Sequence, residues 1–432
     1  MGWSFETDPE YQQKLDWADR FVREEVEPLD HVLGSQYGVK DPDYLRLVRP
    51  LQAQVKAQQL WACHLGPELG GPGYGQVKLG LLNEILGRSR FGPVVFGTQA
   101  PDTGNAEILA HYGSPTQKER YLRPLLDNEI VSCFSMTEPQ GGADPLIFTT
   151  TARLEGGEWV INGEKWFSSN AIHADFLIVM AVTEPDAPPH SRMSMIIVPT
   201  QTPGVEIVRN TGYPGEADRA HAYIRYTDVR VPADNILGGR GQAFVVAQTR
   251  LGGGRIHHAM RTIGEAKKAF DMMAQRAISR FTKGEMLSQK QMVQDKIADS
   301  WIEIEQFRLL VLRTAWLIDK HKDYRKVRRD IAAVKVAMPK VLHDVASRAL
   351  LIHGSYGLCD ETPFIAQIAT SYMLALADGP TEVHKVTIAR ETFKDYTPYQ
   401  GTFPPYHLPT LTNQAREKFG MGAVQEMVDA DG

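Results

Sequence analysis

The 432-residue chain contains only three cysteines, Cys63, Cys133 and Cys359. They are odd in number, far apart and without CxxC spacing, which excludes a disulfide framework and a cysteine-based zinc site. We therefore expect free thiols in a reducing compartment, a cytoplasmic location and no bound metal.

An excess of basic charge is also lacking, because the formal net charge is −5 and no long run of Lys and Arg occurs. Such a chain has no positive field for a polyphosphate backbone, so we expect no nucleic-acid partner. No apolar run approaches the ~18 residues of a membrane helix, and the N-terminus is polar and acidic where a signal peptide is basic and then apolar. Membrane insertion is not expected either.

The chain exceeds the roughly 250–300 residues at which a single hydrophobic core stops growing, so two or three packed units are predicted. Apolar residues recur at helical spacing from Tyr11 to Val26, and residues 76–90 and 104–126 are again helix-like. The break at Gly113-Ser114-Pro115 predicts the start of a new helix within the last range.

After about residue 131 the pattern becomes that of strands. Gly156-Gly157 and Asn162-Gly163 predict two turns between three short strands, because Asn-Gly between apolar runs is a strong hairpin signal. Helical spacing returns at about residue 242, with long helices around Trp301 and over 329–352. Further strands are expected at 176–183, 193–198, 204–208 and 221–231.

The fold class predicted from these periods is mainly α with a β middle domain. The expected boundaries are 1–131 for an N-terminal α-helical domain, 132–241 for the β domain, 242–395 for a C-terminal helical domain and 396–432 for a proline-bearing, loosely packed tail.

One candidate for chemistry is Ala377-Asp378-Gly379-Pro380. A carboxylate directly before a Gly-Pro turn sits on a stiff, non-helical corner from which it can point into a cavity. Taken alone, this sequence is foremost a solvated turn.

A second segment, Cys133 to Asp144, reads CFSMTEPQGGAD and changes that interpretation. It resembles the acyl-CoA dehydrogenase signature in which a strand ends in Thr-Glu-Pro before a glycine-bearing loop. The resemblance covers roughly residues 10–395 and implies the family's fold, with a middle β-barrel or sandwich and a C-terminal four-helix bundle. It also implies FAD, bound here by Phe134, Met136, Thr137 and Gly142. Ala143 replaces the family's Ser, which removes one hydroxyl contact.

The segment Asn162 to Asn170 resembles the family's Asn-Gly-x-Lys-x-Trp-x-Thr-Asn. The resemblance puts Phe167 at the place of the aromatic residue beside the flavin and Ser169 at that of the hydroxyl near flavin N5. Trp166 is displaced by one position, so strand alternation predicts that it points to the opposite face from Phe167.

The spacing of Arg255, Arg280 and Gln291, 25 and then 11 residues, is similar to that of the family's helix-start Arg, FAD-binding Arg and downstream Gln. In the family the second Arg reaches the flavin pyrophosphate of a neighbouring subunit, which implies a homodimer or homotetramer. Gly354, Thr381 and Glu382 fall in the two remaining flavin-contact motifs, with Leu351, Ser355 and Pro380 as departures from the family pattern.

The resemblance implies α,β-dehydrogenation of an acyl-CoA thioester, with flavin N5 accepting the β-hydride and electron-transfer flavoprotein as the usual acceptor. Some members carry the base directly before the helix-start Arg, but Gly254 stands there and cannot accept a proton. Asp378 is therefore the expected catalytic base, with Arg255 close by to favour its ionised form while burial opposes it. The sign of the net pKa shift stays open.

The phrases Lys165 to Ser169, Gly254 to Arg261 and Asp378-Gly379-Pro380 are most similar to the dehydrogenase portion of the kinase-fused mammalian members and their free-standing bacterial relatives. Alternatives remain a flavin oxidase of the nitroalkane-oxidase type, in which an Asp is the base, and a non-catalytic flavin-binding homologue. Chain length, branching, a 4-hydroxy- or 4-phospho-acyl substrate and the natural acceptor stay open. Ala377 and the short Asp378 side chain favour a substrate that is bulky near the thioester.

Overall fold

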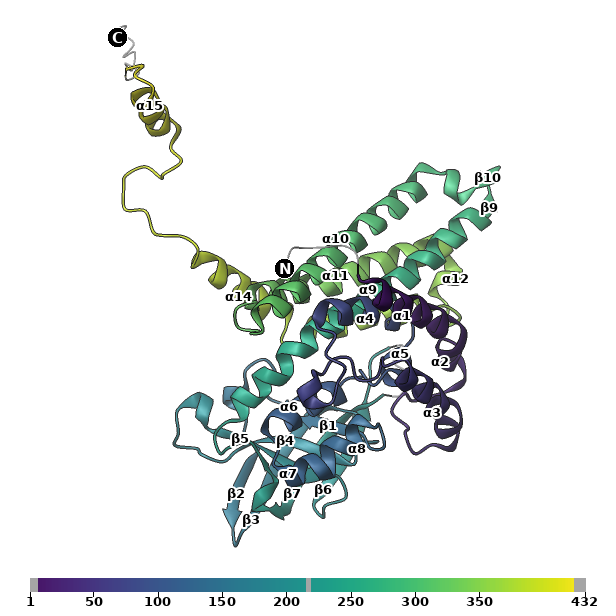
Figure 1. Cartoon of the computed structure of the whole chain (residues 1–432), viewed down its shortest axis with the longest axis vertical. Coiled ribbons are helices and arrows are strands. Elements are labelled where there is room, and N and C mark those ends of the chain that lie inside the picture. The colour runs from purple at the N-terminus through teal and green to yellow at the C-terminus, as the bar shows by residue number, and fades with distance from the viewer. Residues whose placement is uncertain (1–6, 215–218, 423–432) are drawn as a thin grey trace. The chain divides into compact units, whose positions relative to one another are not determined.

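The computed structural model describes residues 7–214 and 219–422. It divides into two compact units, Met1–Ile388 and Ala389–Gly432. The first unit holds three successive blocks of secondary structure, and the ribbon in Figure 1 shows the N-terminal helices in purple and blue, the sheet in teal and the long helices in green.

The N-terminal block is helical, as predicted. Ser114 caps a new helix by accepting a hydrogen bond from the backbone N–H of Gln117, whose side chain bonds back to Ser114 N, so the predicted break at Gly113 is confirmed. The helices are α1 (Pro9–Phe21), α2 (Leu29–Val32), α3 (Pro42–Ala57), α4 (Gln76–Leu86), α5 (Gly92–Val95), α6 (Asp102–Tyr112), α7 (Pro115–Gln117) and α8 (Arg123–Leu126), with π-helical turns at Val22–Val26 and Lys118–Leu122.

The middle block is a mostly antiparallel sheet, of which eight strands fall within the described residues. Its order is β6-β7-β3-β2-β4-β5-β8, and β1 pairs in parallel with β4. The strands are β1 (Ser132–Ser135), β2 (Thr151–Glu155), β3 (Glu158–Ser169), β4 (Phe176–Val182), β5 (Met193–Pro199), β6 (Val205–Thr211), β7 (His221–Pro232) and β8 (Ile236–Leu237).

The predicted turn at Asn162-Gly163 is wrong. Strand β3 runs through both residues, and they form an irregularity in its pairing with β7. The Asn162 side chain pairs with Asp228 instead of closing a turn, and a Cβ on Gly163 would lie 2.5 Å from Thr150 Oγ1. The glycine is needed for this close approach and for its φ of +145°, not for a reversal of the chain.

The C-terminal block consists of long helices, and α9, α10, α11 and α13 pack together as a bundle. Figure 1 shows α9, α10 and α11 running side by side. The elements are α9 (Ala243–Ser279), β9 (Phe281–Thr282), β10 (Glu285–Met286), α10 (Gln291–His321), α11 (Arg328–His353), α12 (Ser355–Leu358), α13 (Phe364–Leu376) and α14 (Thr381–Phe393).

The second unit contains α15 (Leu408–Lys418), which has no buried residue. The sequence did not predict this helix, and residues 423–432 of the expected tail lie outside the described residues. No helix in 7–214 or 219–422 is both long and apolar enough to cross a bilayer. In the same ranges no cluster of three or more His, Cys, Asp or Glu residues is arranged to hold a metal ion.

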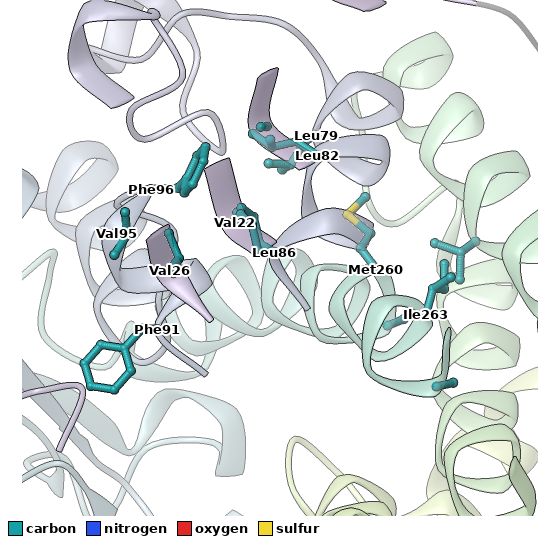
Figure 2. Close-up of a cluster of buried hydrophobic side chains, with 14 of the residues drawn as sticks. Val22, Val26, Leu79, Leu82, Leu86, Phe91, Val95, Phe96, Met260 and Ile263 are labelled. Atoms are coloured by element: carbon teal, nitrogen blue, oxygen red, sulfur yellow. The ribbon is translucent and has the colours of Figure 1, made fainter. Parts of the chain in front are cut away.

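The core of the first unit joins the N-terminal helices to the bundle. Figure 2 shows part of this core, in which N-terminal side chains such as Val22, Leu82 and Phe96 are buried together with Met260 and Ile263 of α9. Helices α4 and α9 pack closely because Gly87 and Gly264 lie at their contact: a Cβ on Gly264 would be 1.9 Å from Glu84 O, and one on Gly87 would be 1.9 Å from Arg261 O.

Gly264→Ala is therefore expected to force α4 away from α9 and to lower the free energy of unfolding by about 1–3 kcal/mol. Denaturant unfolding is the measurement, and Gly34→Ala is the control because a Cβ there meets nothing within 4 Å. Equal stability of Gly264→Ala and the parent would show that this helix contact is not tight.

Candidate active site

Asp378 lies on the corner between α13 and α14. Its φ is +55° and that of Gly379 is +95°, so two successive residues adopt the left-handed region before Pro380. The Asp378 carbonyl accepts hydrogen bonds from Arg255 Nε at 3.0 Å and from His384 Nε2 at 3.2 Å. A left-handed non-glycine residue costs energy and persists where its surroundings hold it, as these two side chains do here.

The Asp378 side chain lines a small cavity of about 20 Å³. Its walls come from α9, α11, α13 and the corner itself, and consist of Arg255, His258, Lys335, Met338, Met373, Leu374, Ala377 and Asp378. The sequence expectation that Arg255 lies close to Asp378 agrees with this arrangement. His258 and Lys335 were not predicted as site residues.

The surroundings of Asp378 are strongly basic. Burial by itself raises the pKa of the Asp378 carboxyl, but His258 and the charges of Arg250, Arg255 and Lys335 outweigh it, so the pKa is lowered. Burial lowers the pKa of His258 to about 4 and that of Lys335 to about 8. His258 therefore carries a charge only at acid pH, where Asp378 itself titrates, and near pH 7 the positive charges around Asp378 are those of Arg250, Arg255 and Lys335.

One face of α9 turns toward Asp378. Arg250, Gly254 and His258 follow one another at i, i+4 and i+8, and a Cβ on Gly254 would lie 3.8 Å from Asp378 Oδ2. The missing side chain thus leaves space beside the carboxylate. Arg250 donates from Nε to Asn105 Oδ1 at 2.9 Å, and its guanidinium lies 4.0 Å from the ring centroid of Phe134.

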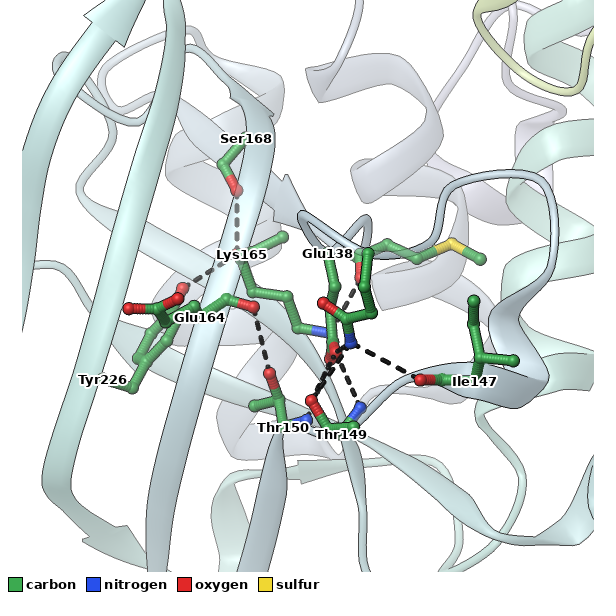
Figure 3. A network of polar contacts seen from close by, with 11 residues as sticks. Glu138, Ile147, Thr149, Thr150, Glu164, Lys165, Ser168 and Tyr226 are labelled. Atoms are coloured by element: carbon green, nitrogen blue, oxygen red, sulfur yellow. Dashed lines mark hydrogen bonds and ion pairs between the residues drawn. The ribbon is translucent and has the colours of Figure 1, made fainter.

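The polar network in Figure 3 holds the loop that follows β1. Lys165 Nζ lies 2.8 Å from Glu138 Oε1 and donates to the Met136 carbonyl at 2.8 Å. Both charged side chains are buried, with 0% and 1% of their surface exposed. Glu138 also accepts from the backbone N–H of Thr149 and Thr150 at 2.6 and 3.0 Å.

The Lys165–Glu138 pair stays ionised near neutral pH. Burial alone raises the pKa of Glu138, but Lys165 and the hydrogen bonds lower it to about 2. Burial lowers the pKa of Lys165 to about 8, against the opposing effect of Glu138. Lys165 Nζ also lies 4.7 Å from the ring centroid of Phe148. Because each buried charge needs these partners, the pair holds the Met136 backbone against β3, and Trp166 N–H holds the Thr137 carbonyl there at 2.8 Å.

Trp166 and Phe167 do not point to opposite faces, so the prediction from strand alternation is wrong. Phe167 has a φ of +48° and lies at an irregularity between Lys165 and Ser168, which turns its ring back onto Trp166. The two rings stack with centroids 4.9 Å apart and an interplanar angle of 12°. Phe167 is 53% exposed, and Ser169 Oγ lies 2.8 Å from His221 Nδ1.

The residues around this loop fit the flavin that the resemblance implies. Trp166 Nε1 is buried and has no hydrogen-bond partner among the described residues. A Cβ on Gly142 would meet only Thr137 Cγ2, at 3.7 Å, so the backbone here is open to a close approach. An unpaired ring donor, an exposed aromatic face and an open glycine backbone suit a large planar heteroaromatic group.

The other predicted flavin contacts lie elsewhere. Arg280 is exposed and directly follows the last residue of α9. At 1.5 Å per residue it lies about 37 Å along the helix from Arg255, so it cannot contact a flavin bound beside Asp378 of the same chain. Gln291 begins α10 and Gly354 follows α11, both exposed. Thr381 begins α14 and donates from Oγ1 to Ala375 O at 3.3 Å, and Glu382 is exposed. Their flavin contacts remain predictions.

Comparison with known proteins gives matches along the whole first unit. The models of the acyl-CoA dehydrogenase N-terminal, middle and C-terminal domains match residues 8–129, 133–229 and 241–393. The chain belongs to the acyl-CoA dehydrogenase family. The resemblance and the predicted fold class are thereby confirmed, and the protein is an FAD-dependent oxidoreductase, since that is the chemistry of this family.

Among its relatives is the probable acyl-CoA dehydrogenase FadE2 of Mycobacterium tuberculosis, 40% identical over 84% of this chain and 91% of that one. Mouse acyl-CoA dehydrogenase family member 10 is 38% identical over 88% of this chain, and rat family member 11 is 37% identical over 89%. This chain spans only 37% and 50% of those two proteins.

Solved structures show the same fold. A Mycobacterium abscessus protein described as an acyl-CoA dehydrogenase is 36% identical, with a TM-score of 0.83 over 91% of this chain and 100% of that one. Butyryl-CoA dehydrogenase of Megasphaera elsdenii, 24% identical, has a TM-score of 0.77 over 90% and 100% of the two chains. The second resemblance supports the fold alone.

Lys165→Met is expected to lower the free energy of unfolding by about 3–5 kcal/mol, because it leaves the Glu138 carboxylate buried without its counter-charge. It is also expected to weaken flavin retention, because the Met136 carbonyl loses its hydrogen bond from Lys165. Denaturant unfolding and flavin content after gel filtration are the measurements.

Adding Glu138→Gln to Lys165→Met is expected to recover part of the loss. Arg225→Met is the control, since Arg225 and Glu164 form an exposed pair at 3.2 Å whose removal costs about 0–1 kcal/mol. A loss in Lys165→Met no larger than in this control would contradict the role given to the buried pair.

Proposed function

We propose that the chain catalyses α,β-dehydrogenation of an acyl-CoA thioester with Asp378 as the base that removes the α-proton. The observation that carries this proposal is an ionised carboxylate on a left-handed corner, in a cavity lined by Arg255 and Lys335 and close to the charge of Arg250. Gly254, the position of the base in some relatives, has no side chain, and Asp378 faces the space that it leaves.

The positive charges around Asp378 help it to act as a base. A thioester α-proton is weakly acidic, so its removal needs an ionised acceptor and stabilisation of the negative charge that develops toward the carbonyl. His258, Arg250, Arg255 and Lys335 keep the carboxylate ionised by lowering the pKa of Asp378. We propose that the backbone N–H of Asp378 stabilises the negative charge that develops at the thioester carbonyl. The chemistry that FAD supplies when bound is acceptance of the hydrogen and two electrons that leave the β-carbon.

For FAD itself we propose a site made by Phe134, Met136, Thr137, Gly142, Phe167 and Ser169, with contributions from Gly354, Thr381 and Glu382. Arg280 and Gln291 are proposed to contact the flavin of a neighbouring subunit, because α9 carries Arg280 far from Asp378 of its own chain. This arrangement requires a homodimer or homotetramer.

We also propose electron-transfer flavoprotein as the electron acceptor, fatty acid β-oxidation as the metabolic setting and the cytoplasm as the location.

The proposed substrate is an acyl-CoA that is branched or oxygen-substituted near the thioester. Ala377 is small and lines the cavity together with the short Asp378 side chain. Met338 and Met373 form flexible apolar walls that can adapt to a branch. The positive charges beside them favour an oxygen-bearing substituent, such as a 4-hydroxy or 4-phospho group, over a purely apolar chain.

Asp378→Asn is expected to retain FAD and the fold but to lower the rate of flavin bleaching by acyl-CoA by at least 10³-fold, because an amide is a poor proton acceptor. The rate is measured anaerobically by stopped-flow absorbance. Asp360→Asn is the control, since Asp360 is exposed on a loop. Bleaching at the parental rate in Asp378→Asn would rule out this choice of base.

Ala377→Tyr is expected to reduce turnover of branched or 4-substituted acyl-CoAs more than that of linear ones, because the larger side chain fills the space beside the substituent. Discrimination in the parent is expected to be modest, about 10–200-fold per methylene-sized group. Turnover of linear, branched and 4-substituted acyl-CoAs of equal chain length is the measurement. A wide preference of the parent for linear chains would contradict the enlarged pocket.

A further inference from the structure

Lys335 is a buried lysine in the middle of α11, only 2% exposed, among apolar neighbours on the same helix. Burying an ammonium group is costly unless it is hydrogen-bonded and near an opposite charge. Lys335 Nζ donates to the Leu374 carbonyl and lines the cavity that contains Asp378. The charge of Asp378 acts on Lys335 across this cavity and opposes the lowering of its pKa by burial.

Leu374 lies in the last turn of α13, where backbone carbonyls have no partner within the helix. A lysine at a helix C-terminus bonds such a carbonyl and interacts favourably with the helix dipole. Asp378 follows only four residues later, on the corner that this helix end leads into. The bond from Lys335 therefore ties that corner to α11.

The other charged and titratable groups that face Asp378 come from α9 and α14. Arg250, Arg255 and His258 all belong to α9, and Arg255 reaches the Asp378 backbone. His384 of α14 contacts the Asp378 carbonyl, and burial lowers the pKa of its ring to about 4, so it is neutral near pH 7. Lys335 is thus the cation that acts on Asp378 from α11.

We propose that Lys335 is a positioning residue for the base: its hydrogen bond to Leu374 holds the end of α13, and its charge beside the cavity keeps Asp378 ionised. This rests on the proposed function, since it assumes that Asp378 removes the substrate proton. A purely structural helix cap would require the hydrogen bond but not the charge. The two roles can be separated because they predict different pH behaviour.

The first experiment compares Lys335→Met, Lys335→Arg and the parent in the pH dependence of anaerobic flavin reduction by acyl-CoA. Removing a nearby cation raises the pKa of a carboxylate, so the acid limb of the Lys335→Met profile is expected about one pH unit above that of the parent. Lys335→Arg keeps the charge and is expected to restore the acid limb. Lys340→Met is the control, because Lys340 lies on the same helix and is 70% exposed.

The second experiment is a double-mutant cycle in melting temperature that does not depend on turnover. At pH 7, Lys335→Met is expected to cost more in the parent than in the Asp378→Asn background, where the negative charge is absent. The coupling energy depends on pH through both groups. It is fully present above the unfolded pKa of Asp, about 3.9, and is lost as pH falls through the lowered folded pKa of Asp378. It is also lost as pH rises through the pKa of Lys335, about 8, where the ammonium loses its charge.

An Asp378→Asn variant that bleaches at the parental rate would overturn the proposed function, and with it the proposal for Lys335. If Asp378 is essential, a Lys335→Met variant with a slower rate but an unmoved acid limb would overturn the proposal alone, leaving Lys335 as a helix cap. If Lys335→Met does not fold, Lys335→Gln is measured in its place. Absence of coupling to Asp378 in the melting cycle would likewise overturn it.

Discussion

The buried ion pair between Lys165 and Glu138 is the interaction on which the arrangement of the middle domain depends. It joins the loop after β1 to the third strand through one charge on each side and a set of hydrogen bonds to Thr149 and Thr150. A pair this deeply buried is stable only when both partners are present. The loop backbone at Met136 and Thr137 is therefore held in place before any ligand binds, and this preorganisation suits the flavin site proposed there.

Helix α9 connects this domain with the base. It is 37 residues long and makes three contacts that matter here: it packs on α4 at Gly264, Arg255 bonds to the Asp378 carbonyl, and Arg250 lies over the ring of Phe134 in β1. One rigid element thus fixes the distance between the proposed flavin site and the proposed base. The positive charges that it brings to the cavity act on a carboxylate that would otherwise favour its protonated form when buried.

Much of the fold was predictable because period and turn chemistry are local. The change from helical to strand spacing near residue 131, and back near 242, matches β1 and α9, and the Ser114 capping box matches the predicted break. The turn predicted at Asn162-Gly163 was wrong because the same residue pair that favours a hairpin also suits a bulge. The close approach of Thr150 and the hydrogen bond to Asp228 select the bulge, and neither contact can be read from the local sequence. The Trp166–Phe167 stack was missed because alternation holds only in a regular strand.

The sequence by itself determined the family, the order of helices and strands, and Asp378 as candidate base, because these depend on residue types at fixed spacings along the chain. Only the tertiary structure decided what surrounds that carboxylate. Lys335 looked like an ordinary helix residue, since nothing in a local pattern shows that a lysine is buried; the signal available was its place within an apolar run of α11. Electrostatic effects depend on distances between segments far apart in the sequence, and those distances exist only once the helices have packed.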